Sequence, residues 1–242
     1  MRLLNTETLK LQDFFDEGIP SYAILSHRWE SDEVSYQDLE AGKNKDGAGY
    51  RKILRCCAKA LDDGHDWVWI DTCCIDKKSS AELSEAINTM FNWYQSATLC
   101  YAYLSDVEPI VTEGPLSYPT FKDSLWFTRG WTLQELISPT EVLFLDRNWS
   151  EIGTRTSLAN EITAATGIPG NAYKTLDSFS VAQKMSWASK RKTSRVEDIA
   201  YSLLGLFDVN MPMLYGEGKR AFIRLQEEII KRSDDESIFV WS

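Results

Sequence analysis

The chain has 242 residues, which is enough for one domain with an elaboration. Hydrophobic residues make up 43% and aromatic residues 12%, so the chain can form a substantial core and is not a disordered or low-complexity polypeptide. The formal net charge of −10 argues against general nucleic-acid binding and against docking on anionic membranes, because both depend mainly on Lys and Arg.

The first half of the chain predicts strands that alternate with helices. The pattern predicts strands at 22–26, 66–71, 99–104 and 141–145, and helices at 49–61, 80–97 and 131–137. The strands are almost continuously apolar, which is typical of a parallel sheet covered by helices on both faces. We expect the core strands to contain Ile24, Val68, Ile70, Tyr101, Tyr103 and Leu143.

The pattern changes at about residue 150. Helices are predicted at 157–166, 180–190, 196–207 and 218–233, with Gly and Pro between them. No long linker separates this part from the rest. We therefore expect a single domain, with an α/β core at 1–149 and a helical extension at 150–242.

Polar segments follow three of the predicted strands. These are Ser26–Trp29, Asp71–Cys74 and Ser105–Asp106. The carboxyl ends of parallel strands meet at one edge of a sheet, and ligands bind at that edge in open α/β folds. His27, Asp71 and Trp131 should therefore lie around one pocket.

No run of about 18 apolar residues is present, and the N-terminus lacks the apolar segment and cleavage site of a signal peptide. The five cysteines are an odd number, and four of them form two adjacent pairs, which makes a disulfide framework awkward. A reduced, cytoplasmic protein is the simplest interpretation.

Three blocks of sequence resemble the motif blocks of the fungal HET (heterokaryon incompatibility) domain. They are Tyr22–Trp29 (YAILSHRW), Trp69–Lys77 (WIDTCCIDK) and Arg129–Ile137 (RGWTLQELI). The segments Glu197–Gly205 and Leu214–Gly218 resemble the part that follows these blocks in many members. The resemblance implies a role in non-self recognition that ends in cell death. HET domains commonly stand at the N-terminus of larger proteins, so this chain could be a fragment of such a protein.

The order of elements is also similar to that of a TIR domain, although more distantly. Trp131 and Glu135 match the Trp-x-x-x-Glu motif of many TIR domains, whose glutamate is needed for NAD cleavage in the catalytically active members. This resemblance implies a TIR-like (flavodoxin-like) parallel sheet, NAD as the substrate with no separate cofactor, and self-association for activity. The helical extension and the Cys73-Cys74 loop depart from a TIR domain.

Glu135 is the main catalytic candidate. On a helix, residues four apart share a face, so Trp131 and Glu135 would present a ring and a carboxylate to one side. Nicotinamide leaves without protonation, so catalysis requires stabilisation of an oxocarbenium-like ribosyl centre, and a nearby carboxylate can supply it. The alternative is an exposed, merely structural glutamate on a helix whose Trp131 packs in the core.

The remaining candidates are substrate-binding residues. They are Ser26, His27, Arg28, Trp29, Asp71, Arg129 and Trp131. Arg28 or Arg129 could hold a phosphate, Trp29 could stack on a base, and Asp71 could bind a ribose. The structural alternative has Trp29 capping the core, Asp71 paired with Arg28 or His27, and Arg129 in a buried ion pair.

Other chemistries have weaker support. Cys73 or Cys74 could act as a nucleophile with His27 or His65, or bind zinc together with Cys56 and Cys57. The chain contains no Cys-x-x-Cys, however, so no metal site is predicted. Glu85 is the other carboxylate of interest. A non-catalytic module that recruits partners through TIR-like surfaces remains the rival hypothesis to an NAD-cleaving enzyme.

Overall fold

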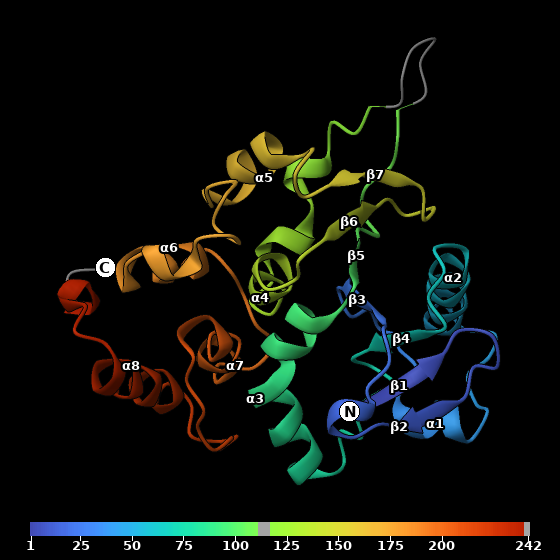
Figure 1. Ribbon diagram of the computed structural model, residues 1–242, viewed down its shortest axis with the longest axis horizontal. Helices are drawn as coiled ribbons and strands as arrows, with labels where there is room; N and C mark the ends of the chain where they lie inside the picture. Colours follow the sequence, from blue (N-terminus) through green and yellow to red (C-terminus); the bar gives the residue numbers. More distant parts are fainter. Residues whose placement is uncertain (111–116, 240–242) are drawn as a thin grey trace.

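The computed structural model describes residues 1–110 and 117–239 (Figure 1). Its strands form one seven-stranded sheet in the order β2-β1-β4-β3-β5-β6-β7. The strands are β1 (Arg2–Asn5), β2 (Leu11–Asp13), β3 (Ala23–His27), β4 (Trp67–Ile70), β5 (Leu99–Tyr103), β6 (Val142–Leu145) and β7 (Glu151–Thr154). The α-helices are α1 (Tyr36–Glu40), α2 (Ala48–Asp62), α3 (Ser80–Ser96), α4 (Thr132–Ile137), α5 (Ala159–Thr166), α6 (Val181–Ala188), α7 (Asp198–Tyr201) and α8 (Arg220–Arg232). Short 3-10 helices are η1 (Asp16–Gly18), η2 (Phe121–Asp123), η3 (Leu125–Thr128), η4 (Leu176–Ser178), η5 (Gly205–Phe207) and η6 (Glu236–Phe239).

The centre of the sheet is parallel, as the sequence predicted. β3 pairs with β4 on one side and with β5 on the other, and β5 pairs with β6, all in parallel. Every predicted core residue lies in one of these strands, and all but Tyr103, which is half-buried, are buried. The α/β fold class is therefore confirmed.

The strands at the two edges were not predicted. β1 and β2 extend the sheet beyond β4, and β7 extends it beyond β6, all by antiparallel pairing. β1 and β2 are short strands with no clear alternation. β1 is held by pairing with β4 across more than sixty residues of chain, and β2 pairs with β1. β7 begins after residue 150, so the sheet continues into the segment predicted to be helical.

Helices cover both faces of the sheet (Figure 1). α2 packs on one face through Ile53, Cys56 and Cys57, and α3 and α4 lie on the other. α3 begins where the sequence indicated, with Ser79 as its N-cap accepting a hydrogen bond from the backbone N of Glu82 at 3.3 Å.

The helical extension packs against α3 and α4 on the side away from the sheet, with α6 and α8 furthest out (Figure 1). The contact is close at Gly205, where an added Cβ would lie 2.1 Å from the Cβ of Phe91 on α3. Arg155, just after β7, donates hydrogen bonds to the carbonyl oxygens of Leu136, Pro139 and Thr140 at the end of α4. The described buried residues of the extension thus belong to the same core cluster as those of the sheet.

All five cysteines are buried free thiols. Within residues 1–110 and 117–239, no helix is both long enough and apolar enough to cross a membrane.

Candidate functional site

A cavity of about 230 Å³ lies at the carboxyl ends of β3 and β4. It is lined by His27, Trp29, Asp71, Ile75, Lys77, Leu83, Ile87, Met90, Arg129, Trp131, Glu135, Ser194, Arg195, Asp198 and Tyr215. His27 ends β3, Asp71 directly follows β4, and Trp131 precedes α4. The structure therefore brings the three residues together around one pocket, as the strand order led us to expect.

Glu135 is a buried carboxyl group in the wall of this cavity, with 6% of its surface exposed. Ser26, on β3, donates a hydrogen bond from Oγ to Oε2 of Glu135, and Trp126 Nε1 donates to Ser26 Oγ at 3.0 Å. Burial raises the pKa of Glu135 to about 8, with a contribution from the nearby charge of Asp71, and the Ser26 hydrogen bond opposes the rise. Glu135 is therefore not exposed, contrary to that part of the structural alternative.

Asp71 and His27 meet at the edge of the sheet. His27 Nε2 lies 3.8 Å from Oδ1 of Asp71 and 3.8 Å from Oε2 of Glu33, beyond hydrogen-bonding distance. Neither ring nitrogen has a hydrogen-bond partner among the described residues, although His27 is only 4% exposed. Burial and the positive charges of Lys52, Arg129 and Lys77 lower the pKa of His27 well below its ordinary value, so the imidazole is neutral.

Trp29 is held in place by Asp71, whose Oδ2 accepts a hydrogen bond from the indole Nε1 at 2.7 Å. Trp29 is 39% exposed, so it does not cap the core as the structural alternative proposed. It lines the mouth of the cavity and leaves aromatic surface open to solvent.

Two of the predicted binding residues do not line the cavity. Ser26 is fully buried behind the wall, where it positions Glu135. Arg28 is half-buried and absent from the lining, because β3 ends at His27 and consecutive side chains point in different directions. Arg28 also forms no ion pair with Asp71, whose contacts are with Trp29 and His27.

The helical extension closes the cavity, which the sequence reasoning missed. Asp198 lies on α7, and its Oδ1 accepts a hydrogen bond from the Tyr215 hydroxyl at 3.0 Å. A hydrogen bond from Trp131 joins this carboxylate to the start of α4. Asp198 and Tyr215 both fall within the two segments that resemble the part following the HET motif blocks. Their place in those segments is the sequence signal that could have identified them as site residues.

Lys77 was also missed as a site residue, although it ends the second of the motif blocks. Its Nζ lies 3.5 Å from the centroid of the Trp29 ring. Burial lowers the pKa of Lys77.

The alternative chemistries gain no support from the geometry. Cys73 and Cys74 are buried and do not line the cavity. A hydrogen bond involving Cys74, together with burial, raises the pKa of the Cys73 thiol well above its usual range. A thiolate nucleophile is therefore disfavoured at Cys73. Glu85 is exposed on α3, away from the cavity.

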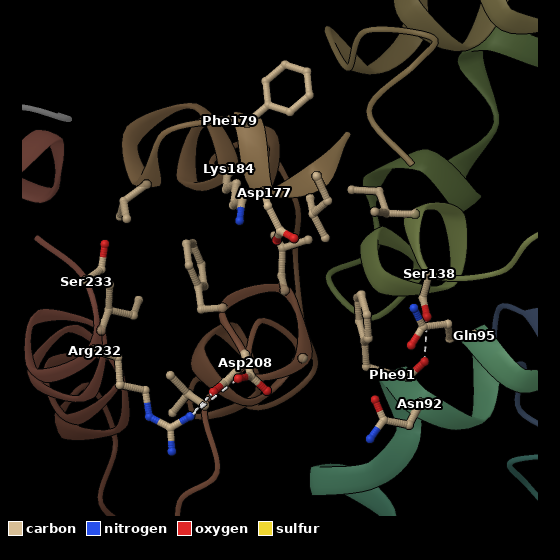
Figure 2. A pocket seen from close by; sticks show the side chains of 18 of the residues that line it. Phe91, Asn92, Gln95, Ser138, Asp177, Phe179, Lys184, Asp208, Arg232 and Ser233 are labelled. Carbon is tan, nitrogen blue, oxygen red and sulfur yellow. Dashed lines mark hydrogen bonds and ion pairs between the residues drawn. The ribbon is translucent and has the colours of Figure 1, made fainter. Parts of the chain in front are cut away.

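A larger cavity, of about 720 Å³, lies between α3, α6, η5 and the end of α8 (Figure 2). Several of its polar groups contact one another. The Ser138 hydroxyl donates to the carbonyl oxygen of Phe91, and an Arg232 guanidinium nitrogen lies 3.7 Å from Oδ2 of Asp208, as Figure 2 shows. No predicted site residue lines this cavity. We therefore take the cavity that contains Glu135 as the functional site.

The comparisons with known proteins agree with the motif blocks. Residues 22–120 match the family described as Heterokaryon incompatibility protein (HET), and residues 220–242 match a domain of unknown function, DUF8212. The chain therefore carries a match to the HET domain at residues 22–120. It is 49% identical, over 243 aligned positions, to the Vegetative incompatibility protein HET-E-1 of Podospora anserina. The alignment covers 96% of this chain but only 18% of that protein. No solved structure matches the chain.

Proposed function

We propose that this chain is a cell-death effector domain of fungal non-self recognition and that it cleaves NAD to nicotinamide and ADP-ribose or a cyclised form. The biological part of the proposal draws on the HET family and on the relative's name as a vegetative incompatibility protein. The chemical part rests on one observation: a buried glutamate, Glu135, lines a cavity at the carboxyl edge of a parallel sheet.

The sheet topology supports the comparison with TIR domains. The four parallel strands lie in the order β4-β3-β5-β6, so that the second strand of this set is followed by the first, third and fourth. Flavodoxin-like sheets have the same order, and their ligands bind where the strand order reverses. That point lies between β3 and β5 here; His27 stands at it, at the end of β3, and Asp71 follows the neighbouring strand β4 on the other side of β3.

In the proposed reaction the bond between ribose C1′ and the nicotinamide nitrogen breaks, and its electron pair leaves with the ring, which becomes neutral. Positive charge then develops on the ribosyl group, and Glu135 as an anion stabilises it in a site with little water. Water attacks C1′ and releases one proton, which gives ADP-ribose.

The raised pKa of Glu135 constrains this mechanism. With a pKa of about 8, the carboxyl group of the free protein is mostly protonated at neutral pH. The nicotinamide ring of NAD carries a positive charge, so binding it nearby favours the ionised form of Glu135. Substrate binding would thus generate the charge that catalysis uses.

The proposal is tested by measuring nicotinamide release from NAD at increasing protein concentration, because activity is expected to require self-association. Expression of the same chain in fungal cells, with viability as the readout, tests the cell-death role. Loss of viability without nicotinamide release at any concentration would favour the non-catalytic interaction module.

A further inference from the structure

Three cationic side chains line the cavity without an anionic partner. Lys77, Arg129 and Arg195 form no ion pair in the described part of the chain. They come from three separate segments, which are the loop after β4, the turn before α4 and the segment before α7. Three cations around one cavity, none of them held in an ion pair, point to an anionic ligand.

Aromatic rings hold these cations in place. Lys77 Nζ lies 3.5 Å from the centroid of the Trp29 ring, and Arg129 Cζ lies 5.7 Å from the same centroid. Arg195 Cζ lies 4.4 Å from the centroid of the Tyr215 ring. A ring face orients a cation but does not neutralise it, so the N–H groups remain available to phosphate oxygens.

The carboxyl groups of the cavity are, in contrast, already engaged. Asp71 accepts the Trp29 hydrogen bond, and Asp198 accepts that of Tyr215. Glu135 is mostly protonated in the absence of ligand, because burial raises its pKa to about 8. An anion entering the cavity therefore meets cations whose N–H groups are free of ion pairs, whereas Asp71 and Asp198, although still charged, each direct an oxygen to a neutral donor and Glu135 is mostly neutral.

A second candidate for phosphate binding is excluded by its own contacts. The turn Gly216–Gly218 has the glycine spacing of a small anion nest, but the backbone N–H groups of Gly216 and Gly218 both donate to Oε1 of Glu197, at 2.8 Å and 3.0 Å. Its donors are thus used within the fold.

We propose that Lys77, Arg129 and Arg195 together bind the phosphates of a nucleoside diphosphate group, and that the helical extension is in this way part of the substrate site. The identification of this group as part of NAD rests on the function proposed above. The existence of the anion site does not depend on that function. The cavity volume of about 230 Å³ is below the roughly 300–1,000 Å³ of pockets that enclose a whole ligand of drug size. The cavity therefore holds one end of a dinucleotide, and the adenosine end lies outside it.

The test is calorimetric binding of ADP-ribose, which carries the pyrophosphate but has no nicotinamide to lose. The variants are Lys77→Gln, Arg129→Gln and Arg195→Gln, and Lys190→Gln is the control, because Lys190 is exposed on the extension and does not line the cavity. Each site variant should weaken ADP-ribose binding by about tenfold, since a charge-assisted hydrogen bond contributes roughly that factor. Lys190→Gln and Arg195→Lys should bind almost as the unaltered protein does. Thermal melting of each variant establishes that it is folded.

Adenosine and nicotinamide riboside, which lack phosphate, should show no dependence on these cations. The inference is overturned if the unaltered protein does not bind ADP-ribose, or if folded site variants bind it as tightly as the control. Cation-dependent ADP-ribose binding without any NAD cleavage would support the anion site and contradict the enzymatic proposal. NAD cleavage together with unchanged ADP-ribose affinity in the variants would support the enzymatic proposal and contradict the anion site.

Discussion

The Ser26 hydroxyl, on the central strand β3, donates a hydrogen bond to the carboxyl group of Glu135, on α4, although the two residues are 109 positions apart in the chain. Ser26 also accepts the indole hydrogen bond of Trp126 at 3.0 Å. The strand therefore fixes the position of the proposed catalytic group from behind the cavity wall, and Ser26 serves as a positioning residue.

Ser26→Ala should shift the pH dependence of NAD cleavage toward higher pH. The Ser26 hydrogen bond lowers the pKa of Glu135, so its removal raises that pKa further and makes the anion scarcer at neutral pH. The rise of kcat/KM with pH, measured through nicotinamide release, should lie near pH 8 in the unaltered protein and at higher pH in the variant.

The same substitution should reduce the free energy of unfolding by about 1–3 kcal/mol, because it leaves the buried Trp126 Nε1 without an acceptor. Ser21→Ala is the matched control, since the Ser21 hydrogen bond to Thr98 is exposed. Equal loss of stability in the two variants, with no change in the pH profile of NAD cleavage, would show that Ser26 does not position Glu135.

Glu135→Gln should change how stability depends on pH. Below pH 4.5 the carboxyl group is protonated in both folded and unfolded chains, and its burial as a neutral group carries no charge penalty. Between pH 4.5 and about 8 the unfolded chain releases a proton that the folded protein keeps, so the stability of the unaltered protein falls as pH rises.

Glutamine does not titrate, so the difference in unfolding free energy should move in favour of the variant by on the order of 3 kcal/mol between pH 5 and pH 7.5. Urea denaturation of both proteins across this range measures it. A difference that stays constant with pH would show that Glu135 is not buried as a neutral acid.

Gly130→Ala should displace the helical extension from the cavity that contains Glu135. Gly130 lies between Arg129 and Trp131, and its backbone N donates to the carbonyl oxygen of Lys192 at 2.8 Å. An added Cβ would stand 2.4 Å from Cγ2 of Thr193. We expect a loss of about 1–3 kcal/mol in unfolding free energy and reduced ADP-ribose affinity.

Thr193→Ser should rescue this variant in part, because it removes the Cγ2 methyl and keeps the hydroxyl that donates to the Arg195 carbonyl oxygen at 2.6 Å. Gly18→Ala, at a position with open space around it, is the control and should have little effect. Failure of Thr193→Ser to restore any stability would show that the close approach at Gly130 is not the cause.

The central parallel strands could be predicted because their burial on both faces requires continuous apolar runs, as in Trp67–Ile70. The edge strands β1 and β2 could not, because they carry few residues, and because β1 joins the sheet through β4, which is far away in the chain, while β2 joins it only through β1. The convergence of His27 and Asp71 followed from a general property of parallel sheets, namely that strands aligned in one direction end at one edge.

The remainder of the site depends on packing between segments that no local pattern connects. Arg195 and Tyr215 reach the cavity only because the extension folds back on α3 and α4. Arg28 and His27 are neighbours in sequence, yet only His27 lines the cavity, because side-chain direction after the end of a strand is set by the tertiary fold.

Nicotinamide release from NAD by the unaltered protein, Glu135→Gln, Glu135→Ala and Glu85→Gln is the most direct test of Glu135 as the catalytic group. Glu85 is the control because it is an exposed glutamate on α3 outside the cavity. Removal of a buried carboxylate that stabilises the transition state costs about 3 kcal/mol or more, so both Glu135 variants should be at least about a hundredfold slower while Glu85→Gln retains full activity. Wild-type rates in Glu135 variants that remain folded by thermal melting would contradict the account.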